Sequence, residues 1–90
     1  MSLNFEISDK LGKILEKLGR RDRNLSIAVN KKIKQIVSSD ITEIEHFKNL
    51  RGDMSHLKRV HVGRFVLSFR LRGEKIIFEN LKHHDDAYKR

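Results

Sequence analysis

The stretch Arg64-Phe-Val-Leu-Ser-Phe-Arg-Leu-Arg72 decides the fold class. Every second residue in it is large and apolar, and this two-residue period predicts a β-strand that buries one face. The apolar residues are Phe65, Leu67, Phe69 and Leu71. Directly after the stretch, Gly73 stands at the first central position of a two-residue turn, as a type II′ hairpin requires. We therefore expect an antiparallel hairpin whose second strand covers Lys75–Leu81.

The residues before this hairpin extend it into a larger sheet. Leu57–Val62 also reads as a strand, and Gly63 lies in the connection to the next one. The C-terminal half is therefore expected to be a three-stranded antiparallel meander. Residues 40–56 carry the weakest pattern, which is typical of an irregular turn of helix around Ile44 and Phe47.

The N-terminal half has the 3.6-residue apolar period of two amphipathic helices. Ser8 is the expected N-cap of the first helix and Gly19 its expected stop. The second helix is expected to begin at Asp22 or Asn24 and to close at residues 38–40, which makes an αα-hairpin with a basic tip. Alternation over residues 3–7 adds a short strand in front. The predicted fold is α+β in the order β-α-α-β-β-β, with the helix hairpin packed on one face of a twisted antiparallel sheet.

Composition narrows the class of protein. The chain has 90 residues, which suits a single domain over 1–90, and a formal net charge of +8. It has no cysteine, which excludes disulfide scaffolds, thiolate zinc sites and cysteine nucleophiles. No apolar run approaches the ~18 residues of a membrane span, and the first residues do not resemble a signal peptide. The composition predicts a soluble intracellular domain whose partner is a polyanion.

Basic residues are expected to gather on the sheet. Residues 51–84 hold eight Lys and Arg against three acidic residues. Such a patch neutralises the phosphates of a nucleic acid whatever its nucleotide sequence. The two-residue period puts Arg59 and His61 on one face of their strand, and three arginines on the polar face of the next strand. The lysines of the helices are interpreted as an ordinary solvated face. The candidate nucleic-acid-binding residues are Arg51, Lys58, Arg70, Arg72 and Lys82.

Five histidines raise the question of a metal site. They are His46, His56, His61, His83 and His84. None has a recognisable ligand spacing except the adjacent pair at 83 and 84, and neighbours on a strand point to opposite faces. No metal site is therefore expected, and acid–base use of an imidazole is the more plausible chemistry. The acids that follow the pair, Asp85 and Asp86, are interpreted as solvated charge at a chain end.

Three motifs follow one another in the second half of the chain. They are Leu50-Arg51-Gly52, then Leu57-x-Arg59-Val60-His61-Val62-Gly63-Arg64-Phe65-Val66-Leu67-x-Phe69, then the tail Lys82-His83-His84-Asp85-Asp86-Ala87-Tyr88. In this order they resemble the RelE/ParE toxin superfamily. The predicted order of elements agrees with that family over essentially the whole chain.

The resemblance implies the toxin of a type II toxin–antitoxin pair, acting in the cytoplasm with no membrane contact. Its implied partners are a cognate antitoxin, the ribosome and mRNA. RelE-like members cut mRNA in the ribosomal decoding site without a metal or other cofactor. The ribose 2′-hydroxyl attacks the adjacent phosphate and leaves a 2′,3′-cyclic phosphate. This chemistry requires cations against the phosphorane and an acid or base.

The resemblance also implies roles for individual residues. Arg59 and Arg64 would hold the phosphate, His84 would be the general acid and His61 a weaker candidate for the base. Tyr88 matches the terminal aromatic position and would lie at the rim. One position departs from the family, because Val66 stands where an arginine commonly grips the scissile phosphate. Arg64 lies two residues away on the same face and is a candidate replacement.

The departure at Val66 keeps other functions open. One is a catalytically degenerate family member. Another is a ParE-like toxin that is not an RNase and blocks a protein target such as DNA gyrase. A third is a small basic nucleic-acid-binding module. Retention of His84 and Tyr88 favours RNA cleavage over a ParE-like activity.

Overall fold

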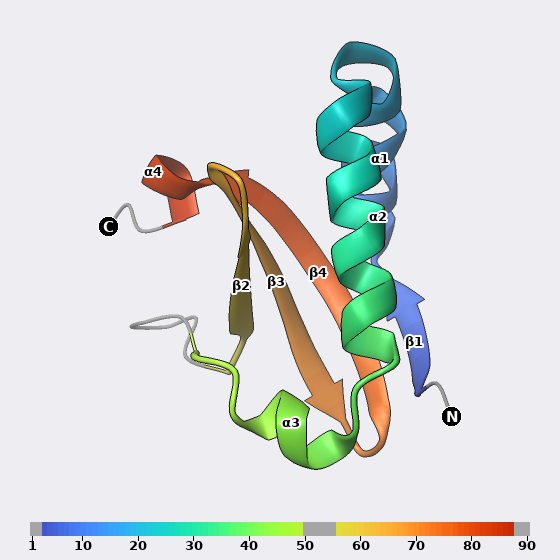
Figure 1. Ribbon diagram of the computed structural model, residues 1–90, viewed down its shortest axis with the longest axis vertical. Coiled ribbons are helices and arrows are strands. Elements are labelled where there is room, and N and C mark those ends of the chain that lie inside the picture. The colour runs from blue at the N-terminus through green and yellow to red at the C-terminus, as the bar shows by residue number, and fades with distance from the viewer. Residues whose placement is uncertain (1–2, 50–55, 88–90) are drawn as a thin grey trace.

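The computed structural model describes residues 3–49 and 56–87 of the chain (Figure 1). Within these ranges the elements follow the order β1 (Asn4–Ile7), α1 (Asp9–Arg21), α2 (Arg23–Val37), α3 (Ile41–Glu45), β2 (Lys58–Val62), β3 (Phe65–Arg72), β4 (Lys75–His83) and α4 (His84–Ala87). The predicted order of strand, helix hairpin and three strands is confirmed, α3 provides the turn of helix expected around Ile44, and α4 is added. No helix in the described ranges is long and apolar enough to cross a membrane.

The four strands form one sheet in the order β1-β4-β3-β2. Strands β2, β3 and β4 are the predicted antiparallel meander, whereas β1 pairs with β4 in parallel, so the sheet is mixed. Ser8 fixes β1 and the start of α1 to β4, because its backbone N–H donates to the Phe78 carbonyl at 2.9 Å and its hydroxyl to the Glu79 carbonyl at 2.7 Å.

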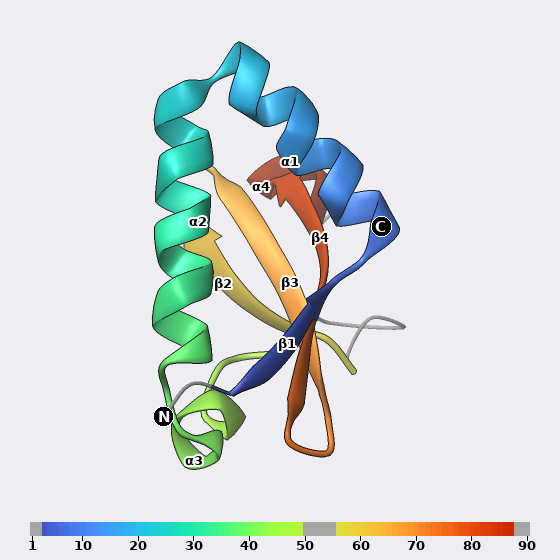
Figure 2. The same ribbon diagram turned by 90° about the vertical axis from the view of Figure 1, so that its right-hand side faces the viewer.

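Helices α1 and α2 cover one face of the sheet (Figures 1 and 2). The core between them is formed by one apolar stripe from each helix and by alternate residues of the strands. Leu67 and Phe69 are fully buried there, and Phe65 and Leu71 pack against the same cluster, so the predicted shared core is confirmed. The Phe69 ring lies edge-on to Phe47, with 5.5 Å between ring centroids.

The expected stop of the first helix at Gly19 is wrong. Helix α1 continues to Arg21 and ends at Asp22, whose backbone N–H donates to the Leu18 carbonyl at 2.8 Å. The Asp22 carboxylate then accepts from the Leu25 N–H at 3.1 Å and caps α2. A glycine inside a helix costs only about 1 kcal/mol relative to alanine, so a neighbouring side chain that caps the next helix decides where the first one ends.

Both hairpin connections have two residues and place a glycine first. Gly63 has φ +60° and Gly73 has φ +63°, while the residues that follow them have no positive φ. This matches the predicted type II′ turn at Gly73 and adds a second one at Gly63, since a type I′ turn would need positive φ at both positions. The two turns fix the pairing register of β2, β3 and β4.

Candidate functional site

The candidate site lies on the sheet face opposite α1 and α2, called here the open face. Part of this face is buried, since Val66 is 2% exposed, Ser68 5% and Asn80 9%. A register shift between Ser68 and Phe69 adds an extra residue, Glu79, to β4. Such a β-bulge turns side chains away from the regular alternation. The open face therefore has a sheltered floor with longer polar side chains around it.

Two rows of side chains cross the open face. Strand pairing aligns His61 with Val66 and Val66 with Lys82, and the neighbouring row joins Arg59, Ser68 and Asn80. Residues two apart on a strand are separated by roughly 6.6 Å, so Arg59 and His61 lie side by side on β2. Val66, which departs from the family pattern, is the buried residue between the His61 imidazole and the Lys82 ammonium group.

His84 reaches the same end of this face from α4. Its ring stacks on that of His61, with 5.5 Å between centroids and 29° between planes. The backbone N–H of His84 donates to the Arg64 carbonyl at 2.7 Å, which holds the first turn of α4 against the β2–β3 turn. Segments more than twenty residues apart in sequence thereby bring two imidazoles together.

The arginines expected beside these histidines lie nearby. Arg59 is partly buried on β2, and its backbone N–H donates to the Lys48 carbonyl at 2.8 Å. Arg64 is exposed in the β2–β3 turn that contacts His84. Three of the five predicted catalytic residues, His61, Arg64 and His84, thus meet at the β2–β3 turn, and Arg59 lies further along β2, across from Ser68. The fifth, Tyr88, and the binding candidate Arg51 lie outside the described residues.

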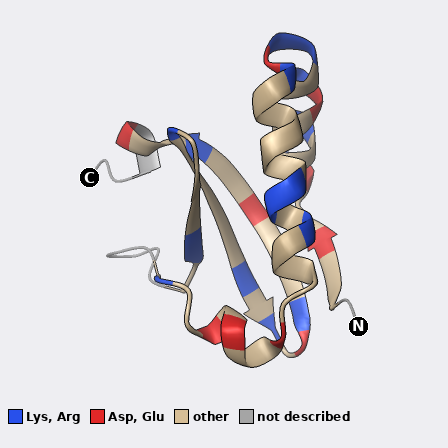
Figure 3. Ribbon diagram, in the orientation of Figure 1, with Lys and Arg blue, Asp and Glu red and all other residues tan. Residues whose placement is uncertain are grey.

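The remaining binding candidates are divided between different surroundings. Lys82 is exposed on the open face, and Arg72 is exposed at the far end of β3. Arg70 forms an ion pair with Glu79, with 2.8 Å between Nε and Oε1. Figure 3 shows further basic residues on α2 and at the tip of the helix hairpin, and acidic residues on α3.

Lys58 does not join this set. It pairs with Phe69 and therefore points to the helix side of the sheet. Its ammonium group donates to the carbonyls of Glu45 and Phe47, at 3.1 and 3.4 Å, and to Asn49 Oδ1 at 3.3 Å. An ammonium group at the C-terminal end of a helix satisfies carbonyls that the helix leaves unpaired. Lys58 thus ties the segment after α3 to β2.

Sequence reasoning missed two acidic partners of site residues. Glu79 holds Arg70, and Asp85 lies within 4 Å of the Nδ1 atoms of both His83 and His84. The order His-His-Asp was visible in the sequence, but the fold of α4 was needed to bring the carboxylate to the rings. Among the residues that the structure describes, no three His, Asp or Glu side chains gather as a metal-ligand group, and metal-free chemistry stays a prediction.

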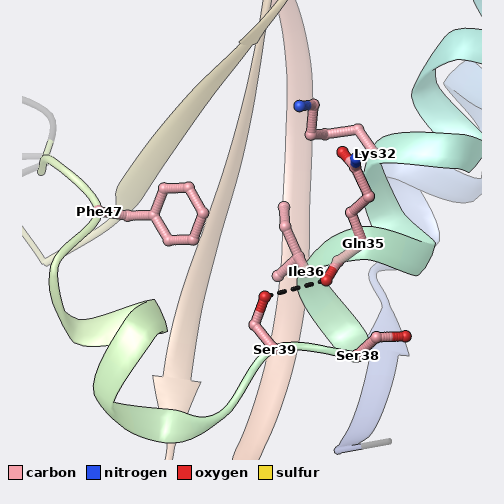
Figure 4. A pocket seen from close by; sticks show the side chains of 6 residues that line it. All are labelled: Lys32, Gln35, Ile36, Ser38, Ser39 and Phe47. Atoms are coloured by element: carbon pink, nitrogen blue, oxygen red, sulfur yellow. Dashed lines mark hydrogen bonds between the residues drawn. The ribbon is translucent and has the colours of Figure 1, made fainter.

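A cavity of about 420 Å³ opens away from these histidines, between the end of α2 and the segment around α3 (Figure 4). Its lining is formed by Lys32, Gln35, Ile36, Ser38, Ser39 and Phe47. In this lining Ser39 Oγ donates to the Gln35 carbonyl at 3.0 Å. None of the candidate catalytic residues contributes to this cavity.

Comparison with known proteins identifies the family. No protein-family profile matches the chain. Over 89 residues it is 39% identical to the protein named toxin RelE4 of Methanocaldococcus jannaschii, covering 96% of this chain and 90% of that protein. The chain belongs to the RelE/ParE toxin superfamily. It is also 34% identical to an uncharacterised protein of Methanosarcina mazei, covering 93% of this chain and 96% of that protein.

Solved structures of RelE/ParE toxins share the fold. YafQ from Escherichia coli superposes with a TM-score of 0.71 at 14% identity, covering 96% of this chain and 98% of that one. The YoeB/ParE toxin from Agrobacterium tumefaciens gives 0.69 at 14% identity, covering 91% and 99%. The toxin–antitoxin complex RelBE2 from Mycobacterium tuberculosis gives 0.64 at 16% identity, covering 92% and 99%. The resemblance read from the sequence motifs is therefore confirmed.

Proposed function

We propose that this protein is the toxin of a type II toxin–antitoxin pair and that it cleaves mRNA bound to the ribosome. The observation that carries the proposal is the His61–His84 stack at a basic end of the open face. Two imidazoles and adjacent guanidinium groups are the set that a metal-free phosphodiester cleavage uses. Membership in the RelE/ParE superfamily supports the same activity.

The proposed reaction uses a general base, a general acid and nearby cations. His61 takes the proton of the ribose 2′-hydroxyl as its oxygen attacks the neighbouring phosphorus. The bond from phosphorus to the 5′-oxygen breaks, and His84 gives a proton to that oxygen. The products are a 2′,3′-cyclic phosphate and a 5′-hydroxyl. Imidazole suits both roles because its charge changes between about pH 5 and 8.

Cations beside the reacting phosphate compensate for the missing arginine at Val66. Lys82 lies directly across from Val66 on β4, and Arg64 lies in the turn beside it. Both side chains are exposed, so positive charge is available from positions next to Val66. A preorganised donor aimed at the developing negative charge contributes about 3–4 kcal/mol of transition-state stabilisation.

The partner that restrains the toxin is proposed to be an acidic antitoxin protein. Two structural neighbours, RelBE2 and the E. coli DinJ–YafQ complex, are described as toxin–antitoxin complexes. A chain with a formal charge of +8 favours a partner of opposite charge. The complex should therefore be far less basic than the free toxin and should survive dilution to nanomolar concentration.

A reconstituted translation system tests the activity. Purified protein is added to ribosomes programmed with a short mRNA, and the RNA ends are mapped with and without ribosomes and with EDTA added under conditions that keep the ribosomes intact. We expect cleavage only on the ribosome, insensitive to EDTA, leaving 2′,3′-cyclic ends. Growth arrest without RNA cleavage, accompanied by loss of gyrase activity, would instead indicate a ParE-like toxin, and EDTA-sensitive cleavage would overturn the metal-free scheme.

A further inference from the structure

We infer that Asp85 is a positioning residue that orients the His84 ring for proton transfer. The inference rests on the proposed RNA cleavage and goes beyond it. It gives a role to a carboxylate that the sequence pattern indicated to be solvated charge. It starts from a contact that the four-residue helix α4 creates. Asp85 Oδ1 lies 3.7 Å from His84 Nδ1 and Asp85 Oδ2 lies 3.8 Å from His83 Nδ1.

The carboxylate lies between two anchored rings. On one side, the Asp85 backbone N–H points to His83 Nδ1 at 3.4 Å, and the His83 ring packs edge-on against Phe65, with 5.4 Å between centroids. On the other side, the His84 ring stacks on His61. The stack and the bond from His84 N–H to the Arg64 carbonyl limit how far α4 can turn. The carboxylate is thereby kept near Nδ1 although its side chain is 86% exposed.

The chemistry of the contact selects one form of the ring. An ionised carboxylate only accepts hydrogen bonds, so the proton of a neutral His84 is favoured on Nδ1, the nitrogen that faces Asp85. Nε2 lies on the far side of the ring, and it is the nitrogen we assign to proton transfer. A carboxylate that fixes the tautomer and orientation of an imidazole plays the same part in the serine protease triad.

The effect should be smaller than that of a buried pair. Water surrounds most of the Asp85 side chain, and exposed ion pairs are weak. The distances of 3.7 and 3.8 Å are also longer than a hydrogen bond, although catalytic contacts tighten when substrate binds. Loss of the carboxylate is therefore expected to slow cleavage about tenfold, well short of the ~10²–10⁴-fold effect of removing an acid or base itself.

The experiment must separate the effect of a lost negative charge from the effect of a lost orientation of the His84 ring. Removing any acidic residue from a site that binds RNA raises the affinity of that site for RNA. Glu74 provides the matched control, since it is an exposed acid in the β3–β4 turn, at the other end of the sheet. Asp85→Asn and Glu74→Gln each remove one negative charge. Only Asp85→Asn should lower kcat for ribosome-dependent cleavage, about tenfold, with KM unchanged or lower. Asp85→Glu should restore most of the loss.

A second measurement does not depend on activity. Nitrogen NMR of the full chain reports which His84 nitrogen carries the proton. We expect the Nδ1–H form in the wild type, and a shift toward the Nε2–H form in Asp85→Asn but not in Glu74→Gln.

The two readouts separate the possible failures. A wild type that does not cleave RNA overturns the proposed function and the catalytic role of Asp85 with it, whatever the NMR result. An active wild type with unchanged kcat and an unchanged His84 tautomer in Asp85→Asn overturns the inference and leaves the proposed function intact. Equal kcat losses in Asp85→Asn and Glu74→Gln would also overturn it, since they would indicate a general charge effect.

Discussion

Replacing His84 by alanine tests the candidate site most directly. The His84 side chain is 52% exposed, and what fixes α4 to the β2–β3 turn is its backbone N–H, which alanine retains. The fold should therefore survive, with a change in the free energy of unfolding within about 0.5 kcal/mol, as for other surface substitutions. The ring that stacks on His61 is lost, and with it the proposed proton donor to the 5′-oxygen.

The expected loss of activity follows from that role. Acid–base catalysis contributes about 10²–10⁴-fold, so cleavage by His84→Ala should fall at least about a hundredfold, or roughly 2.7 kcal/mol in the activation barrier. The assay is single-turnover cleavage of a ribosome-bound mRNA, with urea unfolding measured on the same preparation. His46→Ala is the matched control, because this exposed histidine ends α3 and belongs to no motif. Equal cleavage by His84→Ala and wild type would remove His84 from the mechanism.

Three further predictions address the core, the sheet edge and the open face. Phe69→Ala should destabilise the protein by about 3–5 kcal/mol in urea unfolding, because the fully buried ring packs between Phe47 and Phe78; a loss below about 1 kcal/mol would contradict this core. The hydrogen bond from Lys75 lowers the pKa of Glu6, so the free energy of unfolding should fall as the pH drops below 4.5, the ordinary pKa of a glutamate. In Glu6→Gln the free energy of unfolding should lack this part of its dependence on acid pH. Lys82→Met should weaken RNA binding and reduce the slope of log affinity against log salt concentration by about one. An unchanged slope would show that Lys82 does not contact an RNA phosphate.

The strands could be predicted from the sequence because their pattern is local. The alternation around Phe69 and the glycine at 73 each specify a conformation within a few residues, and both expectations hold. The parallel pairing of β1 with β4 could not be predicted, since it joins residues about seventy positions apart and depends on the path of the helix hairpin. The stop expected at Gly19 failed for a related reason, because the cap at Asp22 competed with the local glycine signal.

The site was predictable only in part, for the same physical reason. Arg59 and His61 are neighbours on one strand face, and the two-residue period places them together without further information. Lys58, next to them in sequence, was expected to bind nucleic acid, but the same period sends it to the other face, where backbone carbonyls bind its ammonium group. The sequence pattern indicated only solvated charge at Asp85, because its partners His83 and His84 are set by the turn of α4 and not by a strand.

The register of β2 against β3 is what converts these local patterns into a site. A slip of one residue would exchange the faces of His61 and Val62 and would take the imidazole away from His84. The two-residue turn at Gly63, with φ +60°, fixes that register, and the carbonyl of the next residue, Arg64, holds α4 in place. The turn therefore has two effects, because it aligns His61 with Val66 and also provides the backbone carbonyl that holds His84 beside His61. In this chain of 90 residues the candidate chemistry thus depends on one glycine turn as much as on the histidines themselves.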